Sequence, residues 1–529
     1  MANKLPIYLD YASTTPADAQ VVAQMLMCMG QGDAFGNAAS LHYYGVKAKE
    51  MIENARTQVA DLINAQKKEI VFTSGATEAI NLALKGAALY YQTRGNHIIT
   101  AVTEHKAVLD SVLELEKLGF KITFLSVQKN GTIKIDDLIN AITSKTILIS
   151  LMYVNNEIGV IQDIPYIANL TRAKDILLHV DCVQAIGKLV IDVKTTPIDL
   201  LSVSAHKIYG PKGVGALYVR AKPKVRLQAL LHGGGHEDGL RSGTLATQQI
   251  VGFGTACLIL KKEMQAEIKK LENLRQKFCK LISEIPNIYF NTDLNNSAAH
   301  IVNISFKGIN GEALLMAINR IAVSSGAACT MANLEPSYVL RALNVENELA
   351  KGSLRISFGR FTTDKEIEFA VKVIKTNVER LRALSLFYDI NDYDFTKNRK
   401  IFLPANYVSD RSTLYNRKSL TQYLNLSNDN IGKFCNDKNI FTAYVGSYEN
   451  GTMLQLQLKM DNDKIVAVKF KVYGCGFAIG TIAFFAQEIK NKTLVSAKLI
   501  TPEEVENAIE LPDGKKYLAR LVAGLLKDF

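Results

Sequence analysis

A lysine directly follows a predicted buried strand in the stretch Ser202-Val-Ser-Ala-His-Lys207-Ile-Tyr-Gly-Pro-Lys-Gly213. The apolar run Leu200–Ser204 predicts the strand, and the Gly-Pro pair at 210–211 predicts a tight turn behind it. A lysine whose stem lies in apolar surroundings can lose its proton and react with an aldehyde. Ser204 and His206 beside it could hold a phosphate group. A surface lysine before a loop is the commoner meaning of such a motif, so its interpretation depends on the rest of the chain.

Short β-rich runs alternate with longer helical stretches up to about residue 385. Strands are predicted within 70–75 and at 98–102, 147–154 and 177–180, and a helix opens at Ala76. This alternation predicts an α/β fold with a mainly parallel sheet. Functional side chains are then expected at the carboxyl ends of the strands, where the connecting loops converge.

Several of these strand ends carry polar residues that together could bind pyridoxal phosphate (PLP). Backbone N–H groups at Ala76, with the Thr77 hydroxyl, could hold the phosphate at the start of the helix. Asp181 could pair with the ring nitrogen and keep the ring an electron sink, while Gln184 could reach the phenolic oxygen. His105 could stack on the ring and move protons. Each residue alone has an ordinary structural explanation, but the combination predicts a PLP site.

A second feature is a cysteine between small residues, in Ser324-Ser-Gly-Ala-Ala-Cys329-Thr-Met-Ala-Asn. Small residues allow such a loop to move, so Cys329 could be a nucleophile that travels to its substrate. A small buried cysteine in a turn is the alternative. Arg355, on a predicted strand, could clamp a substrate carboxylate through both ends of its guanidinium group, and Asn156 could add an amide.

The composition is that of an ordinary globular protein. The 529 residues predict two or three domains, and no apolar run reaches the ~18 residues that a membrane span needs. The first residues resemble neither a secretory signal nor a transit peptide, so a cytoplasmic location is expected. Seven cysteines without a C-x-x-C pair favour reduced thiols over disulfides. The net charge of +11 is spread along the chain, so we expect no direct nucleic-acid binding.

The chain divides at a stretch that has lost all periodicity, residues 386–412, which we interpret as a linker. Before it, residues 1–385 are expected to form a large domain over about 15–260 and a small domain from the N-terminal segment and about 261–385. After it, residues 413–529 contain alternating runs at 453–460 and 465–472, which predict an antiparallel hairpin. A helix at 478–489 and a capped helix from Thr501 complete a small α+β domain.

The motifs of residues 5–385 resemble the cysteine desulfurases of the housekeeping iron–sulfur cluster assembly system. They follow that family's order along the chain: Tyr8-Leu-Asp-Tyr-Ala-Ser-Thr-Thr-Pro16, Gly75-Ala-Thr-Glu78, Glu104-His-Lys106, Val154-Asn-Asn-Glu-Ile-Gly159, His179-Val-Asp-Cys-Val-Gln-Ala185, Ser204-Ala-His-Lys207, Arg241-Ser-Gly-Thr244 and Ser325-Gly-Ala-Ala-Cys329. Asp238 stands where relatives often carry a basic residue. We expect this difference to alter the loop and to leave the reaction intact.

This resemblance implies a PLP-dependent transferase of fold type I that converts L-cysteine to L-alanine. It further implies that Lys207 is the Schiff-base lysine, that Asp181 pairs with the pyridine ring, and that Cys329 carries the sulfur as a persulfide. A homodimer is implied, in which Thr244 reaches the phosphate of the partner subunit's cofactor. The expected partners are a separate iron–sulfur scaffold protein and other sulfur acceptors. With a 2Fe–2S scaffold, Cys329 would be a transient shared metal ligand.

The tail is similar to the scaffold protein on which that system builds its clusters. The likeness rests on Tyr415-Asn-Arg-Lys418, Asn430-Ile-Gly432, Val445-Gly446, Leu454-Gln-Leu-Gln-Leu458 and Val472-Tyr-Gly-Cys-Gly476. Scaffolds of this family hold a cluster with three cysteines, an aspartate and a nearby histidine, whereas this chain keeps only Cys475. The other ligand positions fall on Asn450, Thr452, Tyr517 and Leu518, and Cys435 matches none of them. We therefore expect a degenerate scaffold without a cluster. Cys475 is either an acceptor of persulfide sulfur or an inert remnant.

Two other functions are compatible with parts of this pattern. Another fold type I enzyme, such as an aminotransferase or a selenocysteine lyase, would have no need of the Cys329 thiol. A protein of a different class would use residues 1–385 chiefly to present the tail to assembly partners. Production of alanine from cysteine by a yellow, borohydride-sensitive protein would identify the enzyme.

Overall fold

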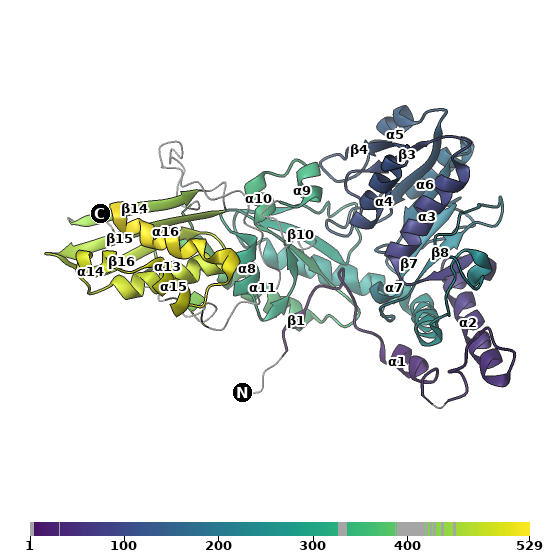
Figure 1. Cartoon of the computed structure of the whole chain (residues 1–529), viewed down its shortest axis with the longest axis horizontal. Helices are drawn as coiled ribbons and strands as arrows, with labels where there is room; N and C mark the ends of the chain where they lie inside the picture. Colours follow the sequence, from purple (N-terminus) through teal and green to yellow (C-terminus); the bar gives the residue numbers. More distant parts are fainter. Residues whose placement is uncertain are drawn as a thin grey trace.

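The computed structural model describes residues 5–30, 32–325, 336–386, 388, 418, 422–423, 426, 430–434, 439–447 and 451–528. Figure 1 shows an elongated molecule with the large sheet and its helices at one end and the sheet of the tail at the other. The small domain lies between them. Cys329, Asn450, Cys435 and most of the predicted linker lie outside the described residues.

A seven-stranded sheet forms the centre of the large domain, with the strand order β2-β8-β7-β6-β5-β3-β4. Strand β8 runs antiparallel to both of its neighbours, and the remaining pairs are parallel, which confirms the prediction of a mainly parallel sheet. The strands are β2 (Ile70–Thr73), β3 (His97–Ala101), β4 (Lys121–Leu125), β5 (Thr146–Met152), β6 (Leu177–Asp181), β7 (Leu200–Ser204) and β8 (Gly215–Val219).

Both faces of this sheet are buried, because neighbouring residues of its strands belong to different hydrophobic cores. Ile98, Leu148 and Leu200 pack with helices α3 and α4 on one face. Ile99 and Leu201 pack with α2, α6 and α7 on the other face. The helices of this domain are α1 (Ala19–Leu26), α2 (Tyr43–Leu62), α3 (Ala76–Tyr91), α4 (Lys106–Lys117), α5 (Ile135–Ala141), α6 (Ile164–Ala173) and the long α7 (Thr247–Ile282), with short 3-10 turns η1 (Lys67–Glu69), η2 (Ala205–Lys207) and η3 (Glu237–Gly239).

The small domain contains a four-stranded sheet of order β12-β13-β10-β9 and a parallel pair formed by β1 and β11. Strand β1 (Ile7–Tyr8) lies near the start of the chain, so this segment is fixed to the small domain before the chain crosses to the large one. The other elements are β9 (Ile288–Phe290), β10 (Ile301–Phe306), α8 (Gly311–Ala317), β11 (Ile321–Ala322), β12 (Ser324–Ser325), α9 (Tyr338–Ala342), α10 (Asn347–Lys351), β13 (Ser353–Ser357) and α11 (Asp364–Leu384).

The tail folds around an antiparallel sheet of β14 (Ile440–Ser447), β15 (Thr452–Asp461) and β16 (Lys464–Tyr473). The predicted hairpin is confirmed in β15 and β16, whereas β14 was not predicted. The predicted helices correspond to α13 (Gly476–Ile489) and to α15 (Pro502–Ala508), which the Thr501 side chain caps. The remaining elements are α14 (Leu494–Lys498), η7 (Asp513–Lys515), α16 (Tyr517–Leu525) and η8 (Leu526–Asp528).

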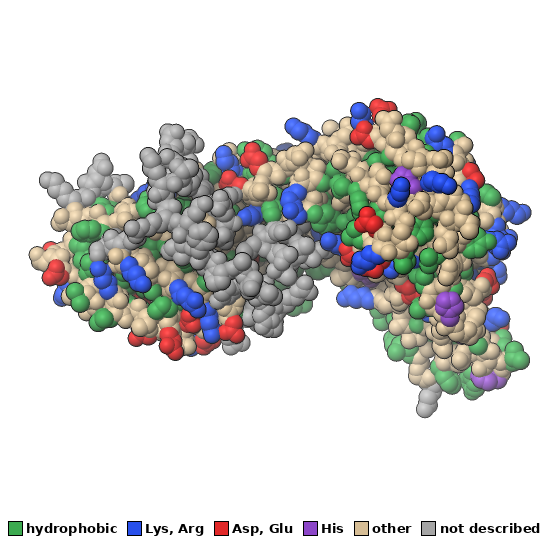
Figure 2. Space-filling view, turned by 45° about the horizontal axis from the view of Figure 1, so that its top comes forward, with side chains coloured by type: hydrophobic (Ala, Val, Ile, Leu, Met, Phe, Trp, Pro, Cys, Tyr) green, Lys and Arg blue, Asp and Glu red, His purple; other side chains and the backbone are tan. Residues whose placement is uncertain are grey.

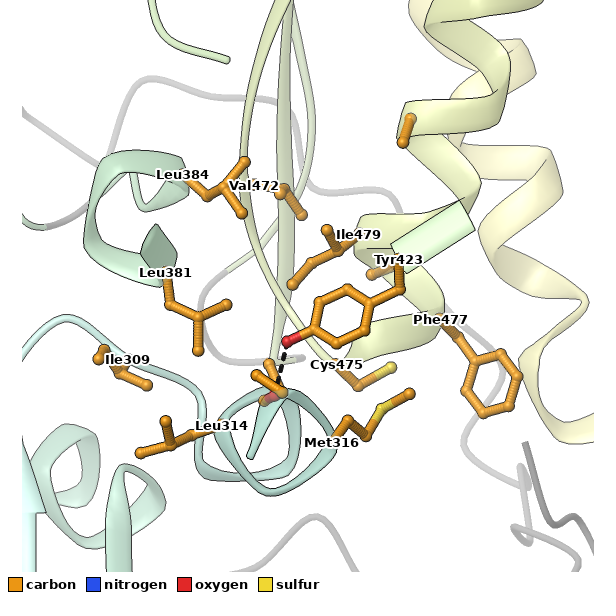
Figure 3. Packing of buried hydrophobic residues seen from close by; sticks show 14 of the residues in the cluster. Ile309, Leu314, Met316, Leu381, Leu384, Tyr423, Val472, Cys475, Phe477 and Ile479 are labelled. Carbon is orange, nitrogen blue, oxygen red and sulfur yellow. Dashed lines mark hydrogen bonds between the residues drawn. The ribbon is translucent and has the colours of Figure 1, made fainter. Parts of the chain in front are cut away.

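One hydrophobic core continues from the small domain into the tail. Figure 3 shows Tyr423 at this seam, with Leu314 of α8 and Leu381 of α11 on one side and Cys475 and Ile479 of the tail on the other. The tail is therefore packed against the small domain along α8 and α11. Among the described residues, no helix combines the length and the apolar character needed to cross a membrane.

Candidate active site

Lys207 lies at the end of η2, directly after β7, as the sequence predicted. Its Nζ donates hydrogen bonds to the backbone carbonyls of Ala12, at 2.5 Å, and Ser13, at 2.7 Å. The segment that carries these carbonyls is held in place because Ala12 N donates to the Ser357 hydroxyl at 2.9 Å. Two of the contacts of the lysine amine are therefore with neutral backbone acceptors of the N-terminal segment.

Two buried carboxyl groups, Asp181 and Glu104, lie at or just after the ends of strands β6 and β3, which lie on either side of β5 in the sheet. Burial raises the pKa of Asp181 at the end of β6, whereas the hydrogen bond from Val183 N and the nearby His105 and Lys207 act in the opposite direction. Burial raises the pKa of Glu104 well above its ordinary value, and Asp181 adds to this effect. Glu104 also accepts a hydrogen bond from Met152 N at 2.9 Å. The negative charge of the pair is therefore favoured on Asp181.

His105 caps helix α4 through its ring. Its Nδ1 accepts a hydrogen bond from Ala107 N at 3.1 Å, so Nδ1 carries no proton in this arrangement. The neutral ring then holds its proton on Nε2, which leaves that atom as the one able to exchange a proton. His105 and Asp181 interact electrostatically, so these two predicted site residues lie near each other.

The first turn of α3 carries Ala76 and Thr77 after a glycine turn. Gly75 has φ +154° and ψ −179°, a backbone conformation that is essentially restricted to glycine. A Cβ atom on the neighbouring Gly215 would lie 2.8 Å from the backbone of Gly75, so both positions require the smallest residue. Thr77 is exposed and the helix N-terminus has positive character, as a phosphate site requires.

Ser204 and His206 occupy different environments beside Lys207. The Ser204 side chain is buried at the end of β7. Nδ1 of His206 lies 3.1 Å from the Thr14 hydroxyl, and burial, assisted by the charge of Lys207, lowers the pKa of this imidazole to about 4. His206 is therefore a neutral hydrogen-bonding group near pH 7. It can hold a phosphate by hydrogen bonding and not by charge.

Arg355 connects β13 to the N-terminal segment and to Asn156. Its Nη1 donates to the Asn156 carbonyl at 2.8 Å, and its Nη2 donates to the Asp10 carboxylate at 2.9 Å. In the part of the chain that the structure describes, Nε of Arg355 and Oδ1 of Asn156 are buried without a hydrogen-bond partner. A bound amino acid could satisfy both groups, because its carboxylate accepts hydrogen bonds and its ammonium group donates them.

The donor set also fits PLP. A buried carboxylate is available for the ring nitrogen, a lysine for the aldehyde and a helix N-terminus for the phosphate. Gln184 is buried beside these groups, and its Nε2 donates to the Ala12 carbonyl at 2.8 Å. Thr244 is exposed in the segment before α7, and among the described residues it forms no hydrogen bond with these groups.

Sequence reasoning missed three contributors to this site. It gave no role to the Asp10–Ser13 backbone, to Glu104 or to His300, although the first two lie in quoted motifs. A polar run directly after the short apolar strand at the N-terminus was the available signal for Asp10–Ser13. His300 carried no such signal, because its place in the site depends on how the two domains are packed.

The retained cysteine of the tail lies at the seam with the small domain. Cys475 is buried at the N-terminus of α13, and this burial raises the pKa of its thiol. Lys515 Nζ lies 3.5 Å from its Sγ and 3.8 Å from the Glu312 carboxylate of α8. Of the unmatched ligand positions, Thr452 and Tyr517 have their hydroxyls 3.4 Å apart, and Leu518 is fully buried in the core of the tail. In the described residues, no group of three His, Cys, Asp or Glu side chains is placed to hold a metal ion.

Comparisons with known proteins agree with this geometry. The family described as "Aminotransferase class-V" matches residues 7–369, and the family described as "NifU-like N terminal domain" matches residues 414–527. The chain is 55% identical over 391 residues to "Cysteine desulfurase IscS" of Neisseria meningitidis serogroup C, covering 74% of this chain and 96% of that protein. It is 53% identical over 388 residues to the protein of the same name from Escherichia coli, with 73% and 96% covered.

Solved structures give the same result. A "NIFS-LIKE PROTEIN" superposes with a TM-score of 0.67 at 34% identity, covering 71% of this chain and all of that one. DndA from Streptomyces lividans superposes with a TM-score of 0.57 at 38% identity, covering 66% and 99%. The chain therefore belongs to the class-V aminotransferase family and, within it, to the PLP-dependent cysteine desulfurases.

Proposed function

We propose that this enzyme converts L-cysteine to L-alanine and transfers the sulfur to Cys329 as a persulfide, for donation to iron–sulfur cluster assembly and other sulfur acceptors. The convergence of Lys207, Asp181 and His105 at the ends of three strands of one sheet supports this proposal most directly. A lysine, a carboxylate and an imidazole are the groups that proton transfer at the α carbon of an amino acid requires.

The residues of the site divide the reaction between them. Arg355 holds the substrate carboxylate, Asn156 adds an amide contact to the substrate, and together they fix the α carbon. PLP, held by Lys207, Asp181, Gln184 and the phosphate-binding turn, supplies the electron sink for the bond broken at that carbon. Lys207 takes the α proton after leaving the carbonyls of Ala12 and Ser13.

Nε2 of His105 is the second group that can exchange protons at the site. A half-buried imidazole with its other nitrogen fixed by the helix cap presents one exchangeable proton in a defined direction. We assign to His105 the transfer of protons to and from the substrate while Lys207 acts at the α carbon.

The sulfur step takes place on the protein thiol. The Cys329 thiolate attacks the substrate sulfur, a new S–S bond forms, and the C–S bond breaks with its electron pair left on carbon. A proton then completes the methyl group of alanine. The sum is L-cysteine plus the Cys329 thiol giving L-alanine plus the Cys329 persulfide, so no external oxidant or reductant is needed.

Alanine production from cysteine by PLP-loaded protein tests this proposal. We expect Lys207→Ala to abolish turnover, because no other described amine lies at the end of β7. Lys212→Ala is the matched control, since Lys212 is exposed five residues further along the same turn. Alanine formation at the wild-type rate by Lys207→Ala would overturn the assignment of the lysine.

A homodimer is the second part of the proposal. Large apolar side chains are exposed around α1 and the start of α2, on the lobe at the lower right of Figure 2. They include Leu26 (61% exposed), Phe35 (55%), Leu41 (96%) and Tyr43 (59%). Exposed apolar side chains that gather on one part of a monomer commonly mark a protein interface. A second copy of the chain would cover it and would bring its Thr244 to the cofactor phosphate, and light scattering of the purified protein tests the dimer.

The third part concerns the tail, for which we propose a scaffold-like module without its own cluster. It is held on α8 and α11 by a shared core, by the hydrogen bond of 2.7 Å from the Tyr423 hydroxyl to the Ala313 carbonyl, and by the Lys515–Glu312 contact. The burial of Cys475 favours a structural role for this thiol over sulfur acceptance. A separate scaffold protein, if it donates or receives sulfur here, would have to use a surface other than the covered face of α8.

Anaerobic reconstitution of the full chain with iron and sulfide tests the cluster prediction. We expect no stable iron–sulfur chromophore in the Cys329→Ser protein, because one cysteine ligand cannot hold a cluster that requires about four ligands. A stoichiometric cluster that disappears in a Cys475→Ser protein would overturn the prediction.

We also propose a cytoplasmic location, supported by the five described cysteines, which are all free thiols.

A further inference from the structure

His300 of the small domain contacts the predicted cofactor residue Gln184 of the large domain. It directly precedes β10, and its carbonyl accepts a hydrogen bond from Phe358 N at 2.9 Å, which fixes its backbone. Its Nε2 lies 3.1 Å from Oε1 of Gln184, and both side chains are buried. Gln184, Lys207 and His300 line one small cavity.

The hydrogen-bond partners determine which way the Gln184 amide faces. The Ala12 carbonyl accepts from Gln184 at 2.8 Å, and a carbonyl can only accept, so the Gln184 atom on that side is the NH2 group. The amide oxygen of Gln184 therefore faces His300. That oxygen can only accept, so Nε2 of His300 must carry a hydrogen.

The same reasoning leaves Nδ1 of His300 without a proton when the ring is neutral. Burial lowers the pKa of His300 well below its ordinary value, and the charges of Lys188, Arg355, Lys207 and Arg275 act in the same direction. Its Nδ1 is buried and has no hydrogen-bond partner in the described residues. The ring is thus a neutral donor through Nε2.

We propose that His300 is a positioning residue: its Nε2–H occupies the oxygen of Gln184, so that Gln184 presents only N–H donors to the cofactor. One of the two N–H bonds reaches the Ala12 carbonyl, which also accepts from Lys207, and the second remains for the phenolic oxygen of PLP. This inference rests on the proposed function, because it assigns Gln184 to the cofactor. A residue of the small domain thus controls the hydrogen bonding of the cofactor through Gln184.

The expected effect is on the proton affinity of the bound cofactor. A donor to the phenolic oxygen stabilises the negative charge that remains there when the cofactor loses its proton at high pH. Without His300 the Gln184 amide can rotate and present its oxygen instead, which would repel that charge. Loss of His300 should therefore raise the pH at which the visible absorbance of the bound cofactor titrates.

A matched pair of variants, His300→Gln and His300→Met, tests the inference. Both side chains have similar length and volume, but only glutamine can donate a hydrogen bond to Gln184. We expect His300→Met to raise the midpoint of the spectral titration by about one pH unit, the effect of losing one charge-assisted hydrogen bond. His300→Gln should restore the wild-type midpoint, and thermal unfolding checks that each variant is folded.

A second comparison identifies the path of the effect. Gln184→Leu should raise the midpoint on its own, and His300→Met added to it should cause no further shift, because His300 acts through Gln184. Equal midpoints for wild type and His300→Met, or an added shift in the double variant, would overturn the inference while leaving the reaction intact. Wild-type protein that forms no alanine and binds no PLP would instead overturn the proposed function, and this inference with it.

Discussion

Replacement of Tyr423 tests how the tail is held on the small domain. The ring of Tyr423 is fully buried at the seam, and its hydroxyl donates to the Ala313 carbonyl of α8 at 2.7 Å (Figure 3). The Arg380 guanidinium of α11 lies 5.6 Å from the ring centroid, and its Nη2 donates to the Tyr423 carbonyl at 2.6 Å. One side chain thus joins the tail to both helices that carry it.

The structure sets the size of the two effects. Tyr423→Phe removes one neutral hydrogen bond and keeps the ring, so it should weaken docking by about 1 kcal/mol, or about fivefold. Tyr423→Ala leaves a ring-sized cavity in a packed core and should cost about 3–5 kcal/mol, or at least a hundredfold. The backbone contact with Arg380 is kept in both variants.

Hydrogen exchange measured by mass spectrometry provides the assay. We expect faster exchange in α8 and α13 for Tyr423→Ala, a smaller increase for Tyr423→Phe, and unchanged alanine production in both. Tyr166→Ala, at a position of α6 that is 48% exposed, is the control for loss of a tyrosine. Wild-type exchange rates in α8 and α13 for Tyr423→Ala would refute the docking described here.

Three further predictions concern the catalytic half. Gly215→Ala should lower the free energy of unfolding by about 1–3 kcal/mol and weaken PLP retention, because the new Cβ would clash with Gly75. Gly524→Ala is the control: it has open space around it and should be neutral or stabilising, and calorimetry measures both variants. Arg355→Lys should raise the KM for cysteine at least about tenfold, since an ammonium group cannot replace the guanidinium fork, and steady-state kinetics with an unchanged KM would contradict that role. Burial lowers the pKa of His179 to about 3. A histidine in the unfolded chain titrates near ~6.5, so the unfolded chain takes up a proton below that pH while the buried His179 does not. The free energy of unfolding is therefore fully retained above that pH and falls as the pH decreases, by about 2 kcal/mol at pH ~5. His179→Gln should therefore show a smaller loss of melting temperature between neutral and acidic pH than wild type.

The sequence was sufficient to predict the architecture of the catalytic half and the placement of several candidate residues at its strand ends. Apolar runs such as Leu200–Ser204 mark strands that are buried on both faces, and the functional residues follow such strands directly. Lys207, Asp181 and His105 were predicted at strand ends because the carboxyl ends of parallel strands meet at one edge. The mainly parallel sheet followed from the same alternation.

The contributions of chain segments distant in sequence could not be predicted. The Ala12 carbonyl contacts Lys207 only because β1 pairs with β11 in another domain, and periodicity carries no information on that pairing. The contact of His300 with Gln184 depends on the packing of two domains in the same way. Strand β14 was missed because Ile440–Ser447 alternates poorly between buried and exposed residues.

Transfer of labelled sulfur from cysteine to the enzyme tests the central claim most directly. PLP-loaded protein is given one equivalent of sulfur-labelled L-cysteine, quenched, and mapped by mass spectrometry while alanine is measured in the same sample. The account predicts one alanine for each labelled persulfide, with the label on Cys329 and absent in Cys329→Ser. Label on Cys182, Cys279 or Cys475 at the wild-type yield in Cys329→Ser, or alanine without any protein-bound sulfur, would contradict it.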